Sequence, residues 1–217
     1  MPSLAPPYQE ASTRLEEICQ TLAEQGYVIQ PDFLDPGAAL ALAAECRQLQ
    51  QAGEFRPAGV GRGENWRLRT EIRSDQIHWL DESACGPEQG QYLALMAAYR
   101  QTLNRQLFLG LVEFEGHCAL YPPGSFYRRH LDQFRGVEQR QVTTILYLNE
   151  DWQAEDGGQL RIELDDEQSI EVPPRLGSFV SFLSARYWHE VLPARRDRLS
   201  ITGWLKTRPI GEVFPLS

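Results

Sequence analysis

The chain has 217 residues, of which 42% are hydrophobic and 24% charged, and this composition is that of an ordinary soluble globular domain. Its formal net charge of −9 argues against a nucleic-acid backbone as the main partner. No stretch approaches the roughly 18 to 20 consecutive apolar residues of a membrane span, and residues 1–8 lack the basic start and apolar run of a signal peptide. We therefore expect one cytoplasmic domain over residues 1–217, favour a monomer, and expect no nucleic-acid or membrane partner.

The cysteines are widely scattered and no CxxC pair exists, so a zinc site is not indicated. Isolated thiols of this kind are typical of a reducing, cytoplasmic compartment. We expect all of them to be reduced: Cys19, Cys46, Cys85 and Cys118.

The first part of the chain, about residues 8–110, is predicted to be a mainly helical support. Apolar residues between Leu15 and Leu22 recur at helical spacing, and Gly26 follows as a stop signal. A short strand is expected directly after it, over residues 27–29.

Two longer helices are predicted further along. One should start after Asp35 and Pro36, because Asp can cap a helix and Pro fits its first turn, and it should end near Gly53. The other is expected over residues 89–109. Its inner face is predicted from apolar spacing to be Leu93, Met96, Ala97, Leu103 and Leu107.

Residues 53–74 contain several glycines and arginines and show little periodicity. They are predicted to form a long mobile loop, and loops of this length in compact domains are often functional lids. Plain surface disorder is the alternative. A strand is expected after the loop, over residues 77–80.

The second part, about residues 111–208, changes to short strands separated by Pro and Gly turns. About eight strands with such breaks predict a double-stranded β-helix, the jelly-roll fold of the cupins. The fold class is therefore α+β, with amino-terminal helices buttressing the core. The expected strands are 112–121, 127–132, 141–148, 159–163, 169–172, 178–183, 189–192 and 199–206.

A metal site is predicted from His130, Asp132 and His189. His130 and Asp132 are two residues apart in an expected strand, so both side chains should point to the same face. Two imidazoles and one carboxylate on a facial triangle leave open positions on an octahedral metal and favour non-haem iron(II). A strand His that is hydrogen-bonded to a nearby carboxylate is the structural alternative.

Arg198 follows His189 by nine residues and leads a predicted strand. A guanidinium there could bind a carboxylate through two hydrogen bonds. The alternative is a surface ion pair with Asp197 or Glu190.

Taken together, these residues resemble the 2-oxoglutarate-dependent oxygenases, and most closely the oxygen-sensing prolyl hydroxylases with their bacterial relatives. The resemblance covers roughly residues 26–208. Its motifs are Ile72–Trp79, Tyr121–Gly124, Tyr127–Asp132, Val142–Asn149 with Asp151 and Trp152, Gly157–Arg161, His189–Ala194, and Arg198–Trp204.

The resemblance implies roles for individual residues around the metal. His130, Asp132 and His189 match the iron ligands. Arg198 matches the residue that pairs with the C5 carboxylate of 2-oxoglutarate, and Tyr147 matches a phenol that binds the same carboxylate. Tyr121, Thr202 and Trp204 match positions that line this pocket, although Tyr147 and Trp204 could instead be core aromatics.

Substrate contacts are also implied. Arg73 and Asp75 match a pair near the substrate entrance, with Asp75 expected to bridge to Arg140. Arg129 is a further candidate substrate contact. An ordinary surface ion pair is the alternative for Arg73 and Asp75.

The implied activity is hydroxylation of a prolyl residue in a protein, expected at C4 in the trans configuration, with elongation factor Tu as a candidate substrate. Iron(II), 2-oxoglutarate and oxygen are the implied cofactor and co-substrates, and ascorbate is a further candidate ligand. Asp132 favours hydroxylation, because related halogenating enzymes lack this ligand. The alternatives are hydroxylation of a free amino acid or other small molecule, a cupin-like protein that holds metal without turnover, and an oxygen sensor.

Overall fold

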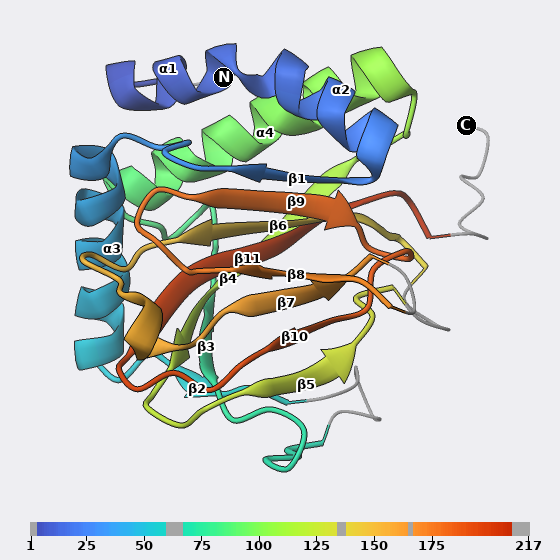
Figure 1. The fold of residues 1–217 in the computed structure, drawn as a ribbon. Coiled ribbons are helices and arrows are strands. Elements are labelled where there is room, and N and C mark those ends of the chain that lie inside the picture. Colours follow the sequence, from blue (N-terminus) through green and yellow to red (C-terminus); the bar gives the residue numbers. More distant parts are fainter. Residues whose placement is uncertain (1–3, 60–66, 134–137, 165–166, 210–217) are drawn as a thin grey trace.

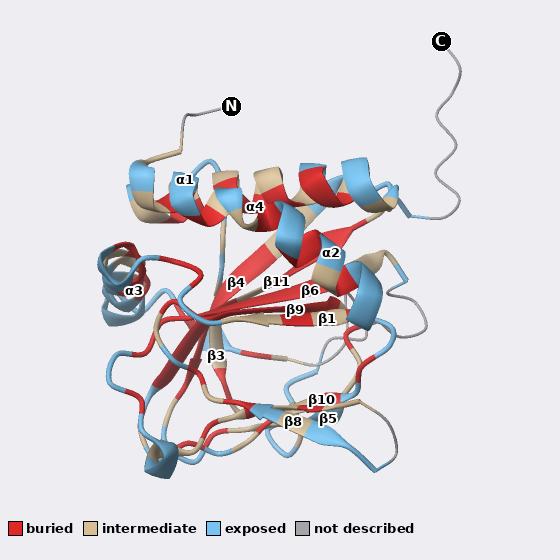
Figure 2. Ribbon diagram, turned by 45° about the horizontal axis from the view of Figure 1, so that its top comes forward, coloured by how far each residue is buried: buried red, intermediate tan, exposed pale blue. Residues whose placement is uncertain are grey.

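A computed structural model describes residues 4–59, 67–133, 138–164 and 167–209. Three layers are visible in Figure 1 and Figure 2: helices on one side, a large twisted sheet in the middle, and a smaller sheet on the other side. Buried residues are concentrated along the large sheet and on the helix faces turned toward it.

The described helices are α1 (Pro6–Thr13), α2 (Leu15–Gln25), α3 (Pro36–Gln51) and α4 (Pro87–Leu107), with a short 3-10 turn at Ala154–Asp156. As predicted, α2 ends at Gly26, whose φ of 82° is the left-handed conformation that glycine adopts without strain. The predicted cap of α3 is also confirmed: the Asp35 carboxylate accepts hydrogen bonds from the backbone amides of Gly37 and Ala38. None of the described helices combines the length and apolar character needed to cross a membrane.

The inner face of α4 differs from the prediction. Leu93 and Ala97 are only partly buried. The face that packs on the large sheet contains two tyrosines that apolar spacing did not select, together with Met96 and Leu103 as predicted. The fully buried residues of α4 with aromatic or aliphatic side chains are Tyr92, Leu95, Met96, Tyr99 and Leu103.

The strands form two antiparallel sheets. The large sheet has seven strands in the order β1-β9-β6-β11-β4-β3-β2, and the small sheet has four in the order β5-β10-β7-β8. Their bounds are β1 Tyr27–Gln30, β2 Arg56–Pro57, β3 Gln76–Trp79, β4 Glu113–Tyr121, β5 Tyr127–His130, β6 Arg140–Tyr147, β7 Leu160–Glu163, β8 Ser169–Val172, β9 Phe179–Leu183, β10 His189–Val191 and β11 Arg198–Lys206.

The eight strands from β4 to β11 form the predicted jelly roll, with four in each sheet. Three strands from the amino-terminal part, β1, β3 and β2, extend the large sheet at both edges. The short strand β2 corrects the expectation of a continuous loop over residues 53–74, because Arg56 and Pro57 pair with Ile77 and Gln76. Residues 60–66 of that predicted loop lie outside the described residues.

Alternation along the strands divides the interior into two cores. On β4, Cys118 and Leu120 join the core between the large sheet and the helices, whereas Ala119 and Tyr121 face the small sheet. On β11, Leu199, Ile201 and Leu205 belong to the helix side. Consequently the alternate residues of both strands point into the space between the two sheets, where a cavity lies.

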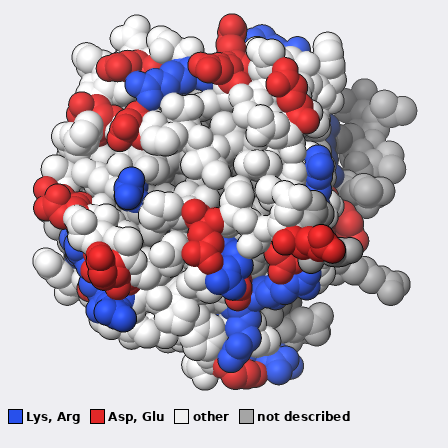
Figure 3. Space-filling view, viewed as in Figure 1, with Lys and Arg blue, Asp and Glu red and all other residues white. Residues whose placement is uncertain are grey.

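The outer face of the small sheet is charged. Arg161 of β7 pairs with Glu171 of β8 and Glu190 of β10, and Arg129 of β5 pairs with Glu163. Figure 3 shows arginine and carboxylate groups side by side on this part of the surface. This face is therefore turned to solvent, and the chemistry that the sequence predicts must lie on the opposite face.

The cap of α3 gives a prediction for stability. Replacing Asp35 with Ala should lower the free energy of unfolding by about 1 kcal/mol, because two backbone amides lose their acceptor. Urea unfolding followed by circular dichroism measures the change. Asp35→Asn, which keeps an acceptor oxygen, should stay close to the unsubstituted protein; equal losses in both variants would contradict the capping role.

Candidate metal and co-substrate site

A cavity of about 790 Å³ opens between the two sheets. Its walls come from β4, β6 and β11 of the large sheet and from β5, β7 and β10 of the small sheet, and residues of β2 and β3 contribute to the lining. All three predicted metal ligands line it, and so does Arg198.

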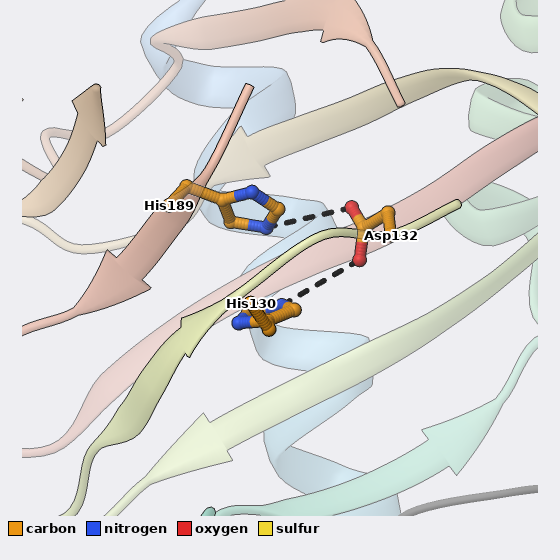
Figure 4. A group of neighbouring side chains, drawn as sticks. All are labelled: His130, Asp132 and His189. Atoms are coloured by element: carbon orange, nitrogen blue, oxygen red, sulfur yellow. Dashed lines mark ion pairs between the residues drawn. The ribbon is translucent and has the colours of Figure 1, made fainter. Parts of the chain in front are cut away.

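The three predicted ligands meet at one point. His130 ends β5, His189 begins β10, and the two residues face each other in the antiparallel register of these strands. Asp132 lies between the two rings, with Oδ1 3.6 Å from His130 Nε2 and Oδ2 3.5 Å from His189 Nε2 (Figure 4). One ligand atom from each residue lies within 4.8 Å of the others, so the group could hold a metal ion.

The backbone sets the orientation of both imidazoles. His130 Nδ1 lies 2.7 Å from the Arg128 carbonyl oxygen, and His189 Nδ1 lies 3.0 Å from the Tyr187 carbonyl oxygen. A proton on each Nδ1 would be donated to these carbonyls, which leaves both Nε2 lone pairs directed at Asp132 and the shared point. Such outer hydrogen bonds fix the tautomer of metal-binding histidines.

Asp132 reaches this point by a different route from the one predicted. The strand ends at His130, so Asp132 is placed by the turn that follows and not by strand alternation. The Thr143 hydroxyl on β6 donates a 2.8 Å hydrogen bond to Asp132 Oδ2. This contact from the opposite sheet fixes the carboxylate, and Thr143 was not identified from the sequence because a single Thr in a strand carries no signal.

Electrostatics favour the protonation states that a metal requires. Burial alone would raise the pKa of Asp132, but the adjacent imidazoles of His189 and His130 outweigh it and hold that pKa well below its usual range. Burial, with His130 beside it, lowers the pKa of His189 to about 4. At neutral pH the site therefore presents a carboxylate and an uncharged His189 imidazole, which are the forms that coordinate a cation.

Arg198 lies fully buried at the start of β11. Its Nε donates to the Gly158 carbonyl oxygen at 2.9 Å, and its Nη1 lies 3.4 Å from Ser200 Oγ. Over the described parts of the chain it has no carboxylate partner, so the predicted alternative of a surface pair with Asp197 or Glu190 is not what the structure shows; Glu190 pairs with Arg161. A buried cation without an anion is costly, which marks this position as one that a carboxylate would occupy.

Two tyrosines flank Arg198. The guanidinium carbon lies 5.1 Å from the centre of the Tyr121 ring and 5.0 Å from that of Tyr147. The Tyr147 hydroxyl is buried, and no hydrogen-bond partner of good geometry lies near it within the described residues. Burial raises the pKa of Tyr147 to about 12, so this phenol stays protonated and can donate to an anion beside Arg198.

Thr202 and Trp204, which follow Arg198 on the same face of β11, also line the cavity. Trp204 is buried, and its ring lies 3.4 Å from the guanidinium carbon of Arg140. Of the five residues predicted for the co-substrate pocket, four line this cavity: Tyr121, Arg198, Thr202 and Trp204. The fifth, Tyr147, is not among the lining residues but flanks Arg198.

The predicted bridge from Asp75 to Arg140 is wrong. Asp75 instead pairs with Arg73 through two hydrogen bonds of 2.8 and 2.5 Å, and Arg140 pairs with Glu115 at 2.7 Å. The Arg73–Asp75 pair is not an ordinary surface pair, because both residues are buried, and the Arg140–Glu115 pair is partly buried. Arg73 and Asp75 are two residues apart, so their side chains reach each other directly, whereas Arg140 on β6 reaches Glu115 on β4 across the intervening strand β11.

Arg129 points away from the cavity. It forms a two-point ion pair with Glu163 and stacks over Trp188 on the outer face of the small sheet. Strand alternation gives the physical reason, because Arg129 precedes the inward-facing His130 by one residue. This placement does not support a contact with a substrate held inside the cavity.

Comparison with known proteins decides the family. The sequence pattern described as the 2OG-Fe(II) oxygenase superfamily matches residues 116–206. The human protein "Prolyl hydroxylase EGLN3" is 30% identical over 198 residues, which cover 88% of this chain and 82% of that protein. This chain belongs to the 2OG-Fe(II) oxygenase superfamily. The name of the family states that its members use iron(II) and 2-oxoglutarate.

Other relatives agree with this family assignment. "Egl nine homolog 1" of Mus musculus is 32% identical over 201 residues, and the chain spans about half the length of that relative, 49%. The crystal structure of a Pseudomonas putida prolyl-4-hydroxylase is 48% identical, with a TM-score of 0.83 and coverage of 89% of this chain and 99% of that one. A prolyl hydroxylase from Trichoplax adhaerens, solved with a hypoxia-inducible factor peptide fragment, is 27% identical, with a TM-score of 0.81 and 91% coverage of each chain.

His117, which matches no predicted ligand position and is expected to be structural, also lines the cavity. It lies between Trp79 and Trp204, with ring centres 4.9 and 5.5 Å away. Its Nδ1 is buried, and no hydrogen-bond partner lies near it within the described ranges. Burial, reinforced by the charge of Arg73, lowers the pKa of His117 to about 3, so the ring is neutral at physiological pH.

This burial of His117 predicts how stability depends on pH. The folded protein keeps the ring neutral down to about pH 3, whereas the unfolded chain takes up a proton near the ordinary pKa of about 6.5. Stability from this group is therefore present above about pH 6.5 and is lost as pH falls, by up to about 1.4 kcal/mol per unit. Urea unfolding of the metal-free protein between pH 4 and 8 should show a flatter profile for His117→Asn; parallel profiles would refute the assignment.

Proposed function

We propose that this chain is a dioxygenase that uses 2-oxoglutarate and molecular oxygen to hydroxylate a prolyl residue in a protein substrate, with release of succinate and carbon dioxide. The reaction is proposed to occur at C4 of the proline ring in the trans configuration. Support comes from the site of this chain and from relatives that are named as prolyl hydroxylases.

The observation that carries the proposal is that one cavity holds a two-His, one-Asp cluster and a buried arginine without a carboxylate partner among the described residues. 2-Oxoglutarate has a keto acid at one end, which can chelate a metal, and a second carboxylate at the other. The cluster of His130, Asp132 and His189 suits the first end, and Arg198 with the Tyr147 hydroxyl suits the second. 2-Oxoglutarate would thus give Arg198 the carboxylate that it lacks among the described residues, and would give the buried Tyr147 hydroxyl an acceptor.

Iron(II), when bound, would supply the oxygen activation that amino-acid side chains cannot provide. The residues of the chain have other tasks. Arg198 would fix the distance and direction of the co-substrate, and Thr143 would hold Asp132 in its position as a ligand. Apolar wall residues of the cavity, such as Leu160 and Val191, would keep water away from the reacting groups.

A peptide substrate is favoured over a small molecule by the relatives, among them one solved with a peptide fragment bound. The cavity in this chain is large enough for a prolyl side chain next to the co-substrate and is bordered by the exposed Trp79. Elongation factor Tu is the first candidate substrate, as the resemblance suggests. Ascorbate binding rests on the resemblance alone and stays a prediction.

The activity can be tested directly. The purified protein should release succinate from 2-oxoglutarate when iron(II) and elongation factor Tu are present, and mass spectrometry should find one added oxygen atom on a prolyl residue. Asp132→Ala and His189→Ala should abolish both signals by removing a ligand. Full turnover in either variant would remove the metal assignment.

The same assay separates the rival functions. Turnover with free proline but not with any protein would favour a small-molecule hydroxylase. Metal binding without succinate release under any condition would favour a cupin-like binding protein. If elongation factor Tu is not modified, mass spectrometry of host proteins from cells with and without the enzyme would identify the substrate.

The role of Arg198 gives a second prediction. Arg198→Ala should raise the 2-oxoglutarate concentration needed for half-maximal turnover about 10- to 150-fold, because a charge-assisted pair contributes about 1.5 to 3 kcal/mol. Titrating 2-oxoglutarate in the succinate assay measures this. Arg195→Ala is the matched control, since Arg195 is an exposed arginine on the preceding loop. An unchanged requirement in Arg198→Ala would exclude the proposed carboxylate contact.

A further inference from the structure

The ring of His130 is stacked face to face on a tyrosine. The centres of the Tyr127 and His130 rings are 3.5 Å apart and their planes differ by 16°. The His130 ring also approaches the ring of His189, at 4.2 Å and a tilt of 55°. His130 thus contacts two aromatic rings, and only one of them belongs to a proposed metal ligand.

His130 needs this support more than the other two ligands do. It is the last residue of β5, an edge strand that pairs only with β10 within the small sheet. It is also the most exposed of the three, with 15% of its side chain accessible compared with 5% for His189 and 6% for Asp132. The contact of Nδ1 with the Arg128 carbonyl restrains one atom of the His130 ring, and a flat neighbouring group is needed to fix the plane of the ring as well.

The tyrosine is itself held in place by Arg73. The guanidinium carbon of Arg73 lies 4.3 Å from the centre of the Tyr127 ring, which also stacks on His130. The edge of the guanidinium, Nε and Nη2, donates to both carboxylate oxygens of Asp75. Arg73 therefore uses its edge for Asp75 and its flat face for Tyr127, a combination that a lysine cannot reproduce.

Backbone contacts join these groups into one unit. The segment that carries Arg73 and Asp75 runs beside β5: Ser74 N donates to the Phe126 carbonyl oxygen, and Arg128 N donates to the Ile72 carbonyl oxygen. Arg73 and Tyr127 form an isolated antiparallel bridge between these bonds. The position of Tyr127 relative to Arg73 is therefore set by main-chain hydrogen bonds and not by the side chains alone.

We propose that Arg73 and Tyr127 are positioning residues that fix the plane of His130 for metal binding, with Asp75 holding Arg73. This inference rests on the proposed metal site. It differs from the expected role of Arg73 and Asp75 in binding substrate: Arg73 Nε and Nη2 are used on the Asp75 carboxylate, and Asp75 is 1% exposed. The Asp75 carboxylate also balances the charge of Arg73, so the stack places no unpaired positive charge next to a cation site.

The test measures metal binding without turnover. Cobalt(II) is titrated into the metal-free protein; its visible absorption spectrum reports the ligand geometry, and competition with a chelator gives the affinity. Tyr127→Leu and Arg73→Lys should each weaken cobalt(II) binding about 10- to 100-fold, the range found when outer contacts of metal-binding histidines are removed. The spectrum of the bound ion should change in both variants.

Two variants serve as controls. Tyr127→Phe keeps the ring and should retain the affinity and the spectrum of the unsubstituted protein. Arg196→Lys alters a comparable arginine, which pairs with Asp156 and lies over Trp152 outside the cavity, and should have no effect. Circular dichroism and urea unfolding establish that each variant is folded, and Arg73→Lys decides the outcome if Tyr127→Leu does not fold.

The outcomes separate the two ideas. Wild-type affinity and spectrum in both Tyr127→Leu and Arg73→Lys would overturn the positioning role while leaving the metal site intact. A loss in Tyr127→Phe equal to that in Tyr127→Leu would also overturn it, because the hydroxyl and not the ring would then be responsible. No cobalt(II) binding by the unsubstituted protein would instead refute the proposed metal site.

Discussion

Along β11 successive side chains point to opposite faces of the large sheet, and this two-residue period decides both where the helices pack and where the cavity opens. Leu199, Ile201 and Leu205 are buried against the helix side, whereas Arg198, Thr202 and Trp204 line the cavity. Because β4 and β6 flank β11 on either side, their alternation is locked to the same register. A one-residue shift of β11 would move the arginine into an apolar core and leucines into the cavity.

The same period explains why much of the site could be predicted from the sequence. Short apolar-polar strands with Pro and Gly turns indicated the jelly roll, and the spacing of His130, His189 and Arg198 on those strands indicated a metal and a carboxylate-binding group. Asp132 was also predicted as a ligand, but the turn after β5 places it and not the strand period. The resemblance to the oxygenases added roles for Tyr121 and Tyr147. The sequence thus predicted which residue types lie on which face of each strand. The comparison with relatives agrees with the family that those residues suggested.

The sequence could not predict which side chains pair with each other across the fold. The two-residue period of a strand predicts which face of the sheet a side chain lies on. It does not predict which residue of another strand lies opposite that side chain. The resemblance suggested Asp75 as the partner of Arg140, whereas the structure pairs that arginine with Glu115. The inner face of α4 was misjudged for a related reason: Tyr92 and Tyr99 are amphipathic, and only the packed structure shows that their rings are buried. The stack of Tyr127 on His130 likewise depends on side-chain geometry at the end of a strand.

The pairing of charges inside the protein decides which arginine of the cavity is left without a carboxylate partner among the described residues. Three of its lining arginines are buried or nearly so, and two of them are neutralised inside the protein, Arg73 by Asp75 and Arg140 by Glu115. Lys206 also pairs with Glu115, and although burial opposes the effect, these two cations lower the pKa of that carboxyl to about 2.

Arg198 is left as the buried cation without a carboxylate among the described residues. Under the proposed function, Arg198 would hold one carboxylate of a two-ended acid, and the keto acid at the other end would reach the cluster of His130, Asp132 and His189, which lines the same cavity. The distribution of internal ion pairs, and not the total charge of the chain, which is negative, leaves Arg198 available for this contact.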